Sequence, residues 1–202
     1  MTGRFVAFEG GEACGKSTQA ERLAARLGAR LTREPGGTPL GARIRELLLD
    51  PSTAGVDPRA EALLLAADRA QHVASVIRPA LERGEDVVSD RYVGSSLAYQ
   101  GFGRGLAVDE IARLSRWATG GLVADLVVLL DVPPWLTAQR MAGAARDRLE
   151  AEDAAFHERV ADGYHVLAAQ DPERWFVIDG VGSIDEVEAR VWSAVEARLA
   201  RA

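Results

Sequence analysis

The sequence predicts an α/β fold, with a parallel sheet of about five strands and helices on both of its faces. Three observations support this prediction. Strand-like and helix-like segments alternate along the whole 202-residue chain, as they do in parallel α/β proteins. Within the expected strand 125–131, residues 126–130 form an unbroken apolar run, which is typical of a strand covered on both faces. A glycine-rich segment joins the first strand to the first helix.

The first half of the chain is expected to hold three strands and three helices. The strands are expected over residues 4–9, 29–33 and 85–89, and the helices over residues 18–28, 39–49 and 57–83. Gly28 is a common C-terminal stop, and Asp57 with Pro58 is a typical helix start. Residues 34–38 read as a loop. Pro79 predicts a kink or a break, because proline removes a backbone hydrogen bond of the helix.

The second half continues the alternation. Strands are expected over residues 125–131 and 175–178, and helices over residues 107–119, 134–143 and 150–169, with a last helix after residue 183. The helix that begins at Pro133-Pro134 is expected to fray at Gly143. Residues 183–186 form a capping box before the last helix. No repeat, linker or second core is visible, so we expect a single domain over residues 1–202, with residues 143–149 as a mobile lid.

Composition limits the functional classes. The net charge is −6 and arginines are mixed with acids along the chain, which argues against binding a nucleic-acid backbone. No apolar run approaches the ~20 residues that cross a bilayer, and the N-terminus does not resemble a signal peptide. The single cysteine, Cys14, excludes an intrachain disulfide and fits a reducing compartment. We therefore expect a cytoplasmic protein that binds neither nucleic acid nor membranes.

The segment Gly10–Ser17 satisfies the pattern G-x-x-x-x-G-K-[ST] between a strand and a helix, which predicts a P-loop NTPase fold. Such a loop points backbone N–H groups at phosphates. Lys16 is the only lysine among 24 basic residues, so this position favours a compact ammonium group. Ser17 is a candidate Mg²⁺ ligand, and Cys14 reads best as a small residue that fits the loop. The expected ATP-binding residues are Gly10, Gly11, Glu12, Ala13, Cys14, Gly15, Lys16, Ser17 and Thr18.

A P-loop alone does not separate kinases from switches and motors. GTPase switches usually read guanine through an Asn-Lys-x-Asp motif, and this chain contains no asparagine. A mechanical ATPase would need a lever or a partner domain, for which 202 residues leave no room. Asp90 is expected at the carboxyl end of a strand, where open α/β sheets bind ligands. Arg91 beside it can bind a phosphate with its planar fork of donors.

Here a specific resemblance appears. The segment Val88–Gln100 resembles the signature of thymidylate kinases, which phosphorylate dTMP to dTDP with Mg-ATP on the route to dTTP. Residues 32–38, 66–72 and 147–150 resemble, in order, the loop after strand two, the base-binding helix and the lid of the bacterial enzymes. The signature itself is Asp-Arg-aromatic, then Ser, then Ala-aromatic, filled here by Asp90, Arg91, Tyr92, Ser95, Ala98 and Tyr99.

The resemblance implies roles for individual residues. Arg91 would bridge the donor and acceptor phosphates, Asp90 would organise Mg²⁺ and its waters, and Glu12 would be the acidic residue of the P-loop. Arg69 would bind the thymine edge, and Tyr99 would lie under the deoxyribose and exclude a 2′-hydroxyl. Further acceptor-side candidates are Leu65, Ser96, Gln100, Glu34 and Pro35.

The resemblance also implies a catalytic cation in the lid. One branch of the family carries arginine at the position of Ala13, whereas the bacterial branch places it in the lid, where Arg148 and Arg146 are the candidates. Leu65 departs from the family pattern, which has an aromatic residue there, and aromatic stacking on a base is worth about 1–3 kcal/mol. This departure puts base selectivity, more than reaction type, in question.

The expected reaction is direct transfer of the ATP γ-phosphoryl to the 5′-phosphate of dTMP, without a covalent intermediate. Two alternatives remain open: a deoxynucleoside kinase, whose acceptor is neutral, and a nucleotide-dependent regulatory protein. The resemblance further implies a homodimer formed through the long helices around residues 58–83.

Overall fold

The computed structural model describes residues 2–53, 55–143 and 145–199. Five strands form one sheet in the order β2-β3-β1-β4-β5, and every pairing in it is parallel. This confirms the predicted fold class. The strands are β1 (Phe5–Glu9), β2 (Arg30–Arg33), β3 (Val87–Asp90), β4 (Leu126–Asp131) and β5 (Trp175–Asp179).

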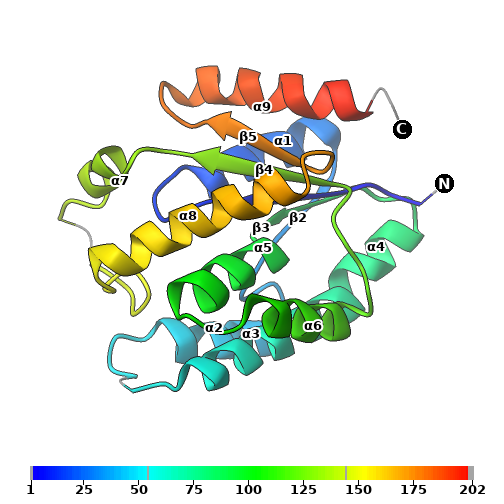
Figure 1. The fold of residues 1–202 in the computed structure, drawn as a ribbon. Coiled ribbons are helices and arrows are strands. Elements are labelled where there is room, and N and C mark those ends of the chain that lie inside the picture. Colours follow the sequence, from blue (N-terminus) through cyan, green and yellow to red (C-terminus); the bar gives the residue numbers. More distant parts are fainter. Residues whose placement is uncertain (1, 54, 144, 200–202) are drawn as a thin grey trace.

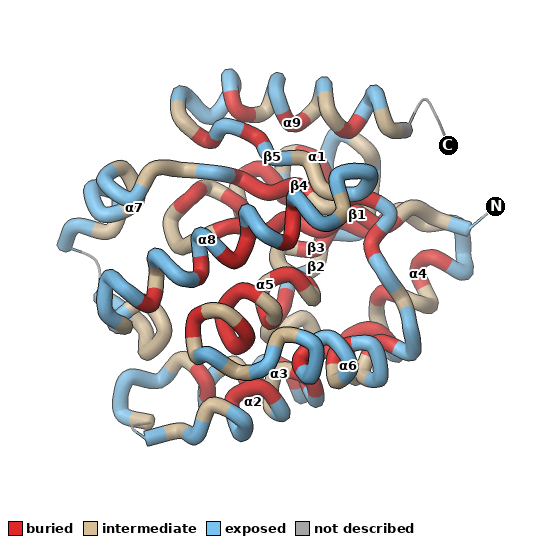
Figure 2. Tube along the Cα trace, in the orientation of Figure 1, coloured by how far each residue is buried: buried red, intermediate tan, exposed pale blue. Residues whose placement is uncertain are grey.

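The central strand β1 is buried along its whole length, as Figure 2 shows. Its neighbours are β3 and β4, with Phe8 opposite both Asp90 and Val128. Because all strands run in the same direction, their carboxyl ends meet at one edge of the sheet. Asp90 and the start of the glycine-rich loop therefore lie close together although 80 residues separate them.

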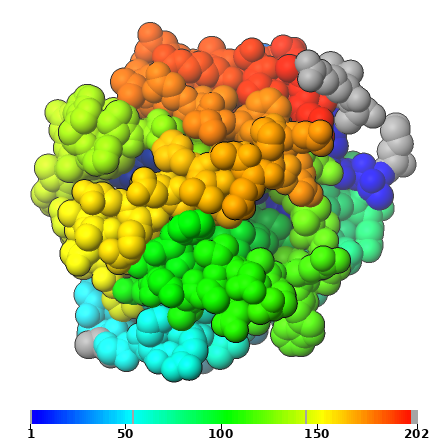
Figure 3. Space-filling model, in the orientation of Figure 1, coloured from blue at the N-terminus to red at the C-terminus, as the bar shows by residue number. Residues whose placement is uncertain are grey.

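Helices cover both faces of the sheet (Figure 1). On one face lie α1 (Lys16–Leu27) and α9 (Ile184–Leu199), which share a core with the sheet through Leu23, Val191 and Val195. The elements on the other face are α2 (Pro39–Leu49), α3 (Pro58–His72), η1 (Val73–Ile77), α4 (Arg78–Glu82), α5 (Val93–Ser96), η2 (Leu97–Gly103), α6 (Val108–Thr119) and α8 (Ala154–Gln170). The π-helical segment η2 packs against α8, and their contact is visible on the surface in Figure 3.

The helical run that contains Pro79 is not broken. The α3, η1 and α4 segments follow one another directly, and the π-helical turn η1 ends with the N–H of Arg78 bonded to the carbonyl of Val73. Pro79 then occupies the first turn of α4, where a missing N–H is tolerated. The wider turn thus accommodates the proline without ending the helix.

Several elements differ from the sequence prediction. The run Val93–Gly103 is helical, although its glycines and serines gave no helical signal. The helix predicted from residue 150 begins at Ala154, because the carboxylate of Asp153 caps the N–H of Phe156 at 2.7 Å. The helix α7 (Pro134–Arg140) ends before Gly143. The capping box is confirmed: the Ser183 N–H donates to Glu186, and the Glu186 N–H donates to Ser183.

Candidate active site

The glycine-rich loop Gly10–Ser17 wraps closely around Lys16. Gly10 has φ +142°, and a side chain there would meet the carbonyl oxygen of Leu130 at 2.7 Å. Gly15, with φ +96°, is the residue from which α1 begins. The ammonium of Lys16 donates to the carbonyl of Gly11 at 2.6 Å and is largely shielded from solvent. Cys14 is buried in the loop, as a small residue that fits there should be.

The two predicted metal ligands face each other. The hydroxyl of Ser17 donates to one carboxylate oxygen of Asp90 at 2.5 Å. The other oxygen of Asp90 is buried and finds no hydrogen-bond partner in the part of the chain that the structure describes. A carboxylate oxygen without a donor beside a serine hydroxyl is a donor set that suits a hard cation such as Mg²⁺. The residues present therefore fit the metal.

Arg91 connects the loop to the rest of the site. It has φ +70°, a conformation that costs energy in a non-glycine residue and is often found at functional sites. Its guanidinium donates to the carbonyl of Gly10 at 3.1 Å and to the carboxylate of Glu12 at 2.7 Å. The hydroxyl of Tyr99 donates to the same Glu12 oxygen at 2.5 Å. Arg91 is thus held against the phosphate loop by the loop's own acidic residue.

The charge state of Glu12 follows from these contacts. Burial disfavours its charged form, but the nearby positive charges of Arg91 and Lys16 outweigh this and lower the pKa of Glu12 to about 2. Glu12 is therefore ionised at neutral pH. It balances the positive charge that Lys16 and Arg91 bring to the loop.

A second acid, Glu9, was not among the residues predicted from the sequence. Its carboxylate accepts from the hydroxyl of Ser95 at 2.5 Å and from the backbone N–H of Tyr92 at 3.0 Å. Burial raises the pKa of Glu9 above its ordinary value. Ser95 in turn accepts from Arg91 at 3.0 Å, so Glu9 helps to orient Arg91. Its position at the end of a buried strand, just before Gly10, could have identified Glu9 from the sequence.

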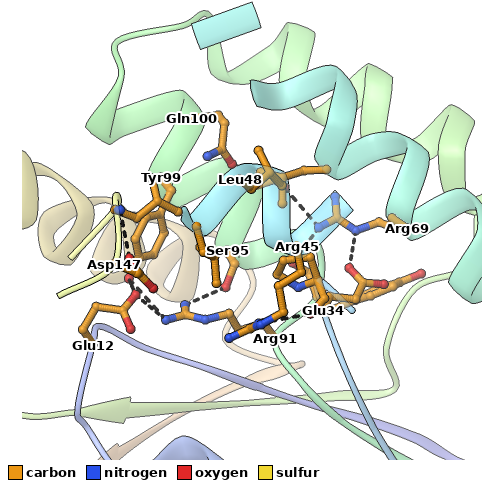
Figure 4. A pocket seen from close by; sticks show the side chains of 16 residues that line it. Glu12, Glu34, Arg45, Leu48, Arg69, Arg91, Ser95, Tyr99, Gln100 and Asp147 are labelled. Carbon is orange, nitrogen blue, oxygen red and sulfur yellow. Dashed lines mark hydrogen bonds and ion pairs between the residues drawn. The ribbon is translucent and has the colours of Figure 1, made fainter. Parts of the chain in front are cut away.

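A pocket opens beside Arg91 (Figure 4). Residues of α2, α3 and the α5–η2 segment line it, together with Asp147 and Leu149. All the acceptor-side candidates from the sequence line it, including Leu65, which is therefore not simply a core residue. The full lining is Glu12, Glu34, Pro35, Arg45, Leu48, Leu49, Leu65, Arg69, Arg91, Tyr92, Ser95, Ser96, Tyr99, Gln100, Asp147 and Leu149.

Arg69 is rigidly held in the floor of this pocket. Its Nε donates to the buried carboxylate of Glu34 at 2.7 Å. Its terminal nitrogens donate to the hydroxyls of Ser96 and Ser115 and to the carbonyl of Tyr92. These four bonds use four of the five N–H groups of a guanidinium. Among the described residues, one N–H of Arg69 is left for a ligand.

Arg45 also lines the pocket, and the sequence prediction missed it. It donates to the carbonyl of Pro35 at 3.1 Å and is only partly exposed to solvent. Burial and the neighbouring charge of Arg33 lower the pKa of Arg45. A half-buried cation in these surroundings is suited to an anionic ligand. Its place on the inward side of α2 was the only signal in the sequence.

The lid candidates are not brought to the phosphate loop. Arg148 donates to the carboxylate of Glu61 at 2.6 Å and to the carbonyl of Leu48 at 2.7 Å, so it is bound to α3 and α2. Arg146 is exposed to solvent. Ala144, within the predicted lid, lies outside the described residues. Arg140 of α7 contacts the loop instead, and donates to the carbonyl of Ala13 at 3.0 Å.

Comparison with known proteins agrees with this geometry. The family model described as "Thymidylate kinase" matches residues 8–191. The chain belongs to the thymidylate kinase family. It is 50% identical to the thymidylate kinase of Deinococcus radiodurans, over 97% of this chain and 98% of that protein. It is 51% identical to that of Leifsonia xyli, over 98% and 96%.

A solved structure of the family has the same fold. The crystal structure of thymidylate kinase from Ehrlichia chaffeensis superposes with a TM-score of 0.82 at 30% sequence identity, over 97% of this chain and 100% of that one. A thymidylate kinase needs a donor site and an acceptor site that meet at the transferred phosphoryl group. In this structure the P-loop and the pocket meet at Arg91.

Proposed function

We propose that this member of the thymidylate kinase family transfers the γ-phosphoryl group of ATP to the 5′-phosphate of dTMP, with the donor on Gly10–Thr18 and the acceptor in the pocket beside Arg91. The observation that carries the proposal is the position of Arg91. Its guanidinium contacts the P-loop at Gly10 and Glu12, and it lines the pocket as well. One planar fork of donors can therefore reach both phosphates.

On the donor side, Lys16 and the backbone N–H groups of Gly11, Ala13 and Gly15 would hold the ATP phosphates. Lys16 is bonded to a backbone carbonyl within the loop. A phosphate oxygen would replace that weaker acceptor. Arg140 extends this side, because it contacts the carbonyl of Ala13. Cys14 and Thr18 shape the loop and the start of α1.

On the acceptor side, Arg45 and Arg91 would bind the phosphate, and Arg69 the base. Tyr99 is held by Glu12 and Arg91, so its ring has a fixed position against the sugar. Leu65, Pro35 and Ser96 would contact the base. Glu34 acts through Arg69. The whole set forms a site in which both reactants are positioned before transfer.

Ser17 and Asp90 would hold Mg²⁺ between them. When bound, the ion would withdraw charge from the phosphate oxygens. Lys16 and Arg91 stabilise the negative charge that develops during phosphoryl transfer. As the phosphates arrive, Arg91 leaves its ion pair with Glu12 to bind them. No side chain is needed as a nucleophile, because the acceptor phosphate is itself one.

A homodimer is supported by the outer surface of the helices α2, α3 and α6. Large apolar side chains are exposed on it: Leu47, Leu63 and Trp117, the last with 81% of its surface accessible. Such a patch is typical of an interface. Light scattering should give twice the chain mass of 21.6 kDa, and Leu63→Glu should lower it to the mass of one chain.

We also propose a single-domain organisation and a cytoplasmic location for this chain. The one five-stranded sheet supports a single domain over residues 1–202. Within the described residues, no helix has the length and apolar character needed to cross a bilayer. The single cysteine, which cannot form an intrachain disulfide, fits a cytoplasmic protein.

A coupled assay for ADP tests the reaction directly. Mg-ATP is offered with dTMP, dUMP, dCMP, dGMP, AMP or thymidine in separate reactions. A strong preference for dTMP is expected. Transfer to thymidine in place of dTMP would indicate a deoxynucleoside kinase and contradict the role given to Arg45 and Arg91. Absence of transfer to every acceptor would favour a regulatory protein.

A further inference from the structure

We infer that Glu61 is a positioning residue for acceptor specificity: it orients the side-chain amide of Gln100 so that the pocket is offered a hydrogen-bond acceptor. This inference rests on the assignment of the pocket to the acceptor nucleotide. Glu61 itself does not line the pocket. Its effect is transmitted through Gln100, which does.

The contact between the two residues determines which way the amide points. The Nε2 atom of Gln100 donates to Oε1 of Glu61 at 2.9 Å. Glu61 is fully buried and Gln100 is 1% exposed. An ionised carboxylate can only accept hydrogen bonds, and only the nitrogen of a glutamine amide can donate one. The carbonyl of Gln100 must therefore point away from Glu61.

The carbonyl oxygen of Gln100 faces the pocket without a protein donor among the described residues. Its Oε1 atom is buried and has no hydrogen-bond partner within the described ranges of the chain. Leaving a buried carbonyl unpaired costs about 1–3 kcal/mol, so this atom is suited to a donor on a ligand. Figure 4 shows the Gln100 side chain reaching in among the residues that line the pocket.

Glu61 is kept ionised by the groups around it. Arg104 donates to it through Nε and Nη2 at 3.2 and 3.1 Å, and Arg148 donates at 2.6 Å. Burial disfavours the charged form of Glu61, but hydrogen bonds from Arg104, Gln100 and Arg148 outweigh it and lower its pKa. Arg104 also pairs with Glu152 at 2.6 Å. The cluster therefore holds two acids and two arginines.

The chemical consequence is a choice between pyrimidine bases. Thymine and uracil carry an N–H donor at ring position N3, whereas the N3 of cytosine is an acceptor. The carbonyl oxygen of Gln100 can accept a hydrogen bond from the N3–H group of thymine or uracil. Opposite cytosine, the same oxygen would face the lone pair of N3. Sites that place a buried polar group opposite a substrate group reject analogues that leave it unpaired. Glu61 thus helps to exclude dCMP, but it does not distinguish dTMP from dUMP.

The test is Glu61→Gln, which keeps the shape of the side chain but allows it to donate as well as accept. Gln100 is then free to turn its amide over. We expect the ratio of kcat/KM for dTMP to that for dCMP to fall at least about tenfold, the size of one hydrogen bond. The ratio for dTMP to dUMP should stay within twofold of the original. A pocket that is merely loosened would change both ratios.

Glu152→Gln is the matched control, because it makes the same substitution on the other acid of the cluster and leaves the bond from Gln100 to Glu61 in place. It should keep the original dTMP-to-dCMP ratio. If Glu61→Gln does not fold, the double variant Glu61→Gln/Arg148→Gln removes one acid and one base together, and the same fall in the ratio is expected.

A folded Glu61 variant with an unchanged dTMP-to-dCMP ratio would overturn the inference, and so would equal changes in both ratios. The pocket assignment is checked separately with Arg69→Gln. If that variant leaves the KM for dTMP unaltered, the acceptor lies elsewhere, and the fault is in the proposed site rather than in the role of Glu61.

Discussion

Arg148 Nη2 lies 2.6 Å from Glu61 Oε2, so the guanidinium is bound to α3 and not to the phosphate loop. The backbone N–H of Arg148 also donates to the carbonyl of Leu49, and its Nε to that of Leu48. These are carbonyls of the last turn of α2, which has no basic residue of its own there. Arg148 therefore supplies the cation that a helix C-terminus favours.

From this position we predict that Arg148→Ala raises the KM for dTMP about fivefold or more, with a smaller change in kcat. The residues that Arg148 ties together, Leu48 and Leu49 among them, form a wall of the pocket. Steady-state kinetics with dTMP varied at saturating ATP measure the effect. Arg113→Ala, on the exposed surface of α6, is the control. A loss of kcat near 10³-fold with unchanged KM would instead give Arg148 the role of an arginine finger.

Arg140→Ala should act on the other substrate. Because Arg140 contacts the carbonyl of Ala13 in the phosphate loop, its loss should raise the KM for ATP several-fold and leave the KM for dTMP nearly unchanged. Kinetics with ATP varied at saturating dTMP test this. Equal changes in the two constants would contradict a role confined to the donor.

Lys16→Ala and Arg91→Ala should each lower kcat by about 10²–10³-fold, the usual cost of removing one donor that stabilises developing charge. Arg91→Lys should remain strongly impaired, because a point charge cannot replace a planar fork that reaches two phosphates. Circular dichroism and thermal unfolding would verify that each variant is folded. Turnover close to the original in a folded Arg91 variant would remove the main support for the proposed site.

Glu12→Gln should change how stability depends on pH. Glu12 has a pKa of about 2 in the folded protein against 4.5 ordinarily, so its contribution is complete above about pH 4.5 and is lost as the pH falls towards 2. The unfolding free energy should therefore rise less steeply with pH in the variant. In this window the slopes of the two proteins should differ by up to about 1.4 kcal/mol per pH unit. Urea titrations from pH 3 to pH 6 would measure it. Parallel curves for the two proteins would mean that the ion pair with Arg91 is weak.

Leu65→Phe should increase affinity for dTMP. Leu65 lines the pocket near Arg69, and an aromatic ring there could stack on the base, which is worth about 1–3 kcal/mol. Calorimetric titration with dTMP should give a Kd at least fivefold lower. A weaker Kd would show that the pocket has no room for the ring, and that Leu65 is matched to its neighbours.

Much of the architecture could be predicted from local signals. All five strands were recognisable, since buried parallel strands are short apolar runs between helical segments, and the phosphate loop was recognisable from the spacing of Gly10, Gly15 and Lys16. The helical run Val93–Gly103 was not predicted. Its glycines and serines have weak helix propensity, and packing of η2 against α8 stabilises it.

The sequence by itself determined the fold class, the phosphate loop and the resemblance that named Asp90, Arg91 and Arg69, because each depends on residues close together in the chain. Only the tertiary structure decided which charges meet. Glu9 with Ser95, Glu61 with Gln100 and Arg148 with Glu61 join residues 39 to 87 positions apart. Such pairs form when separate helices and strands pack, and no local pattern records which partner a buried charge will find.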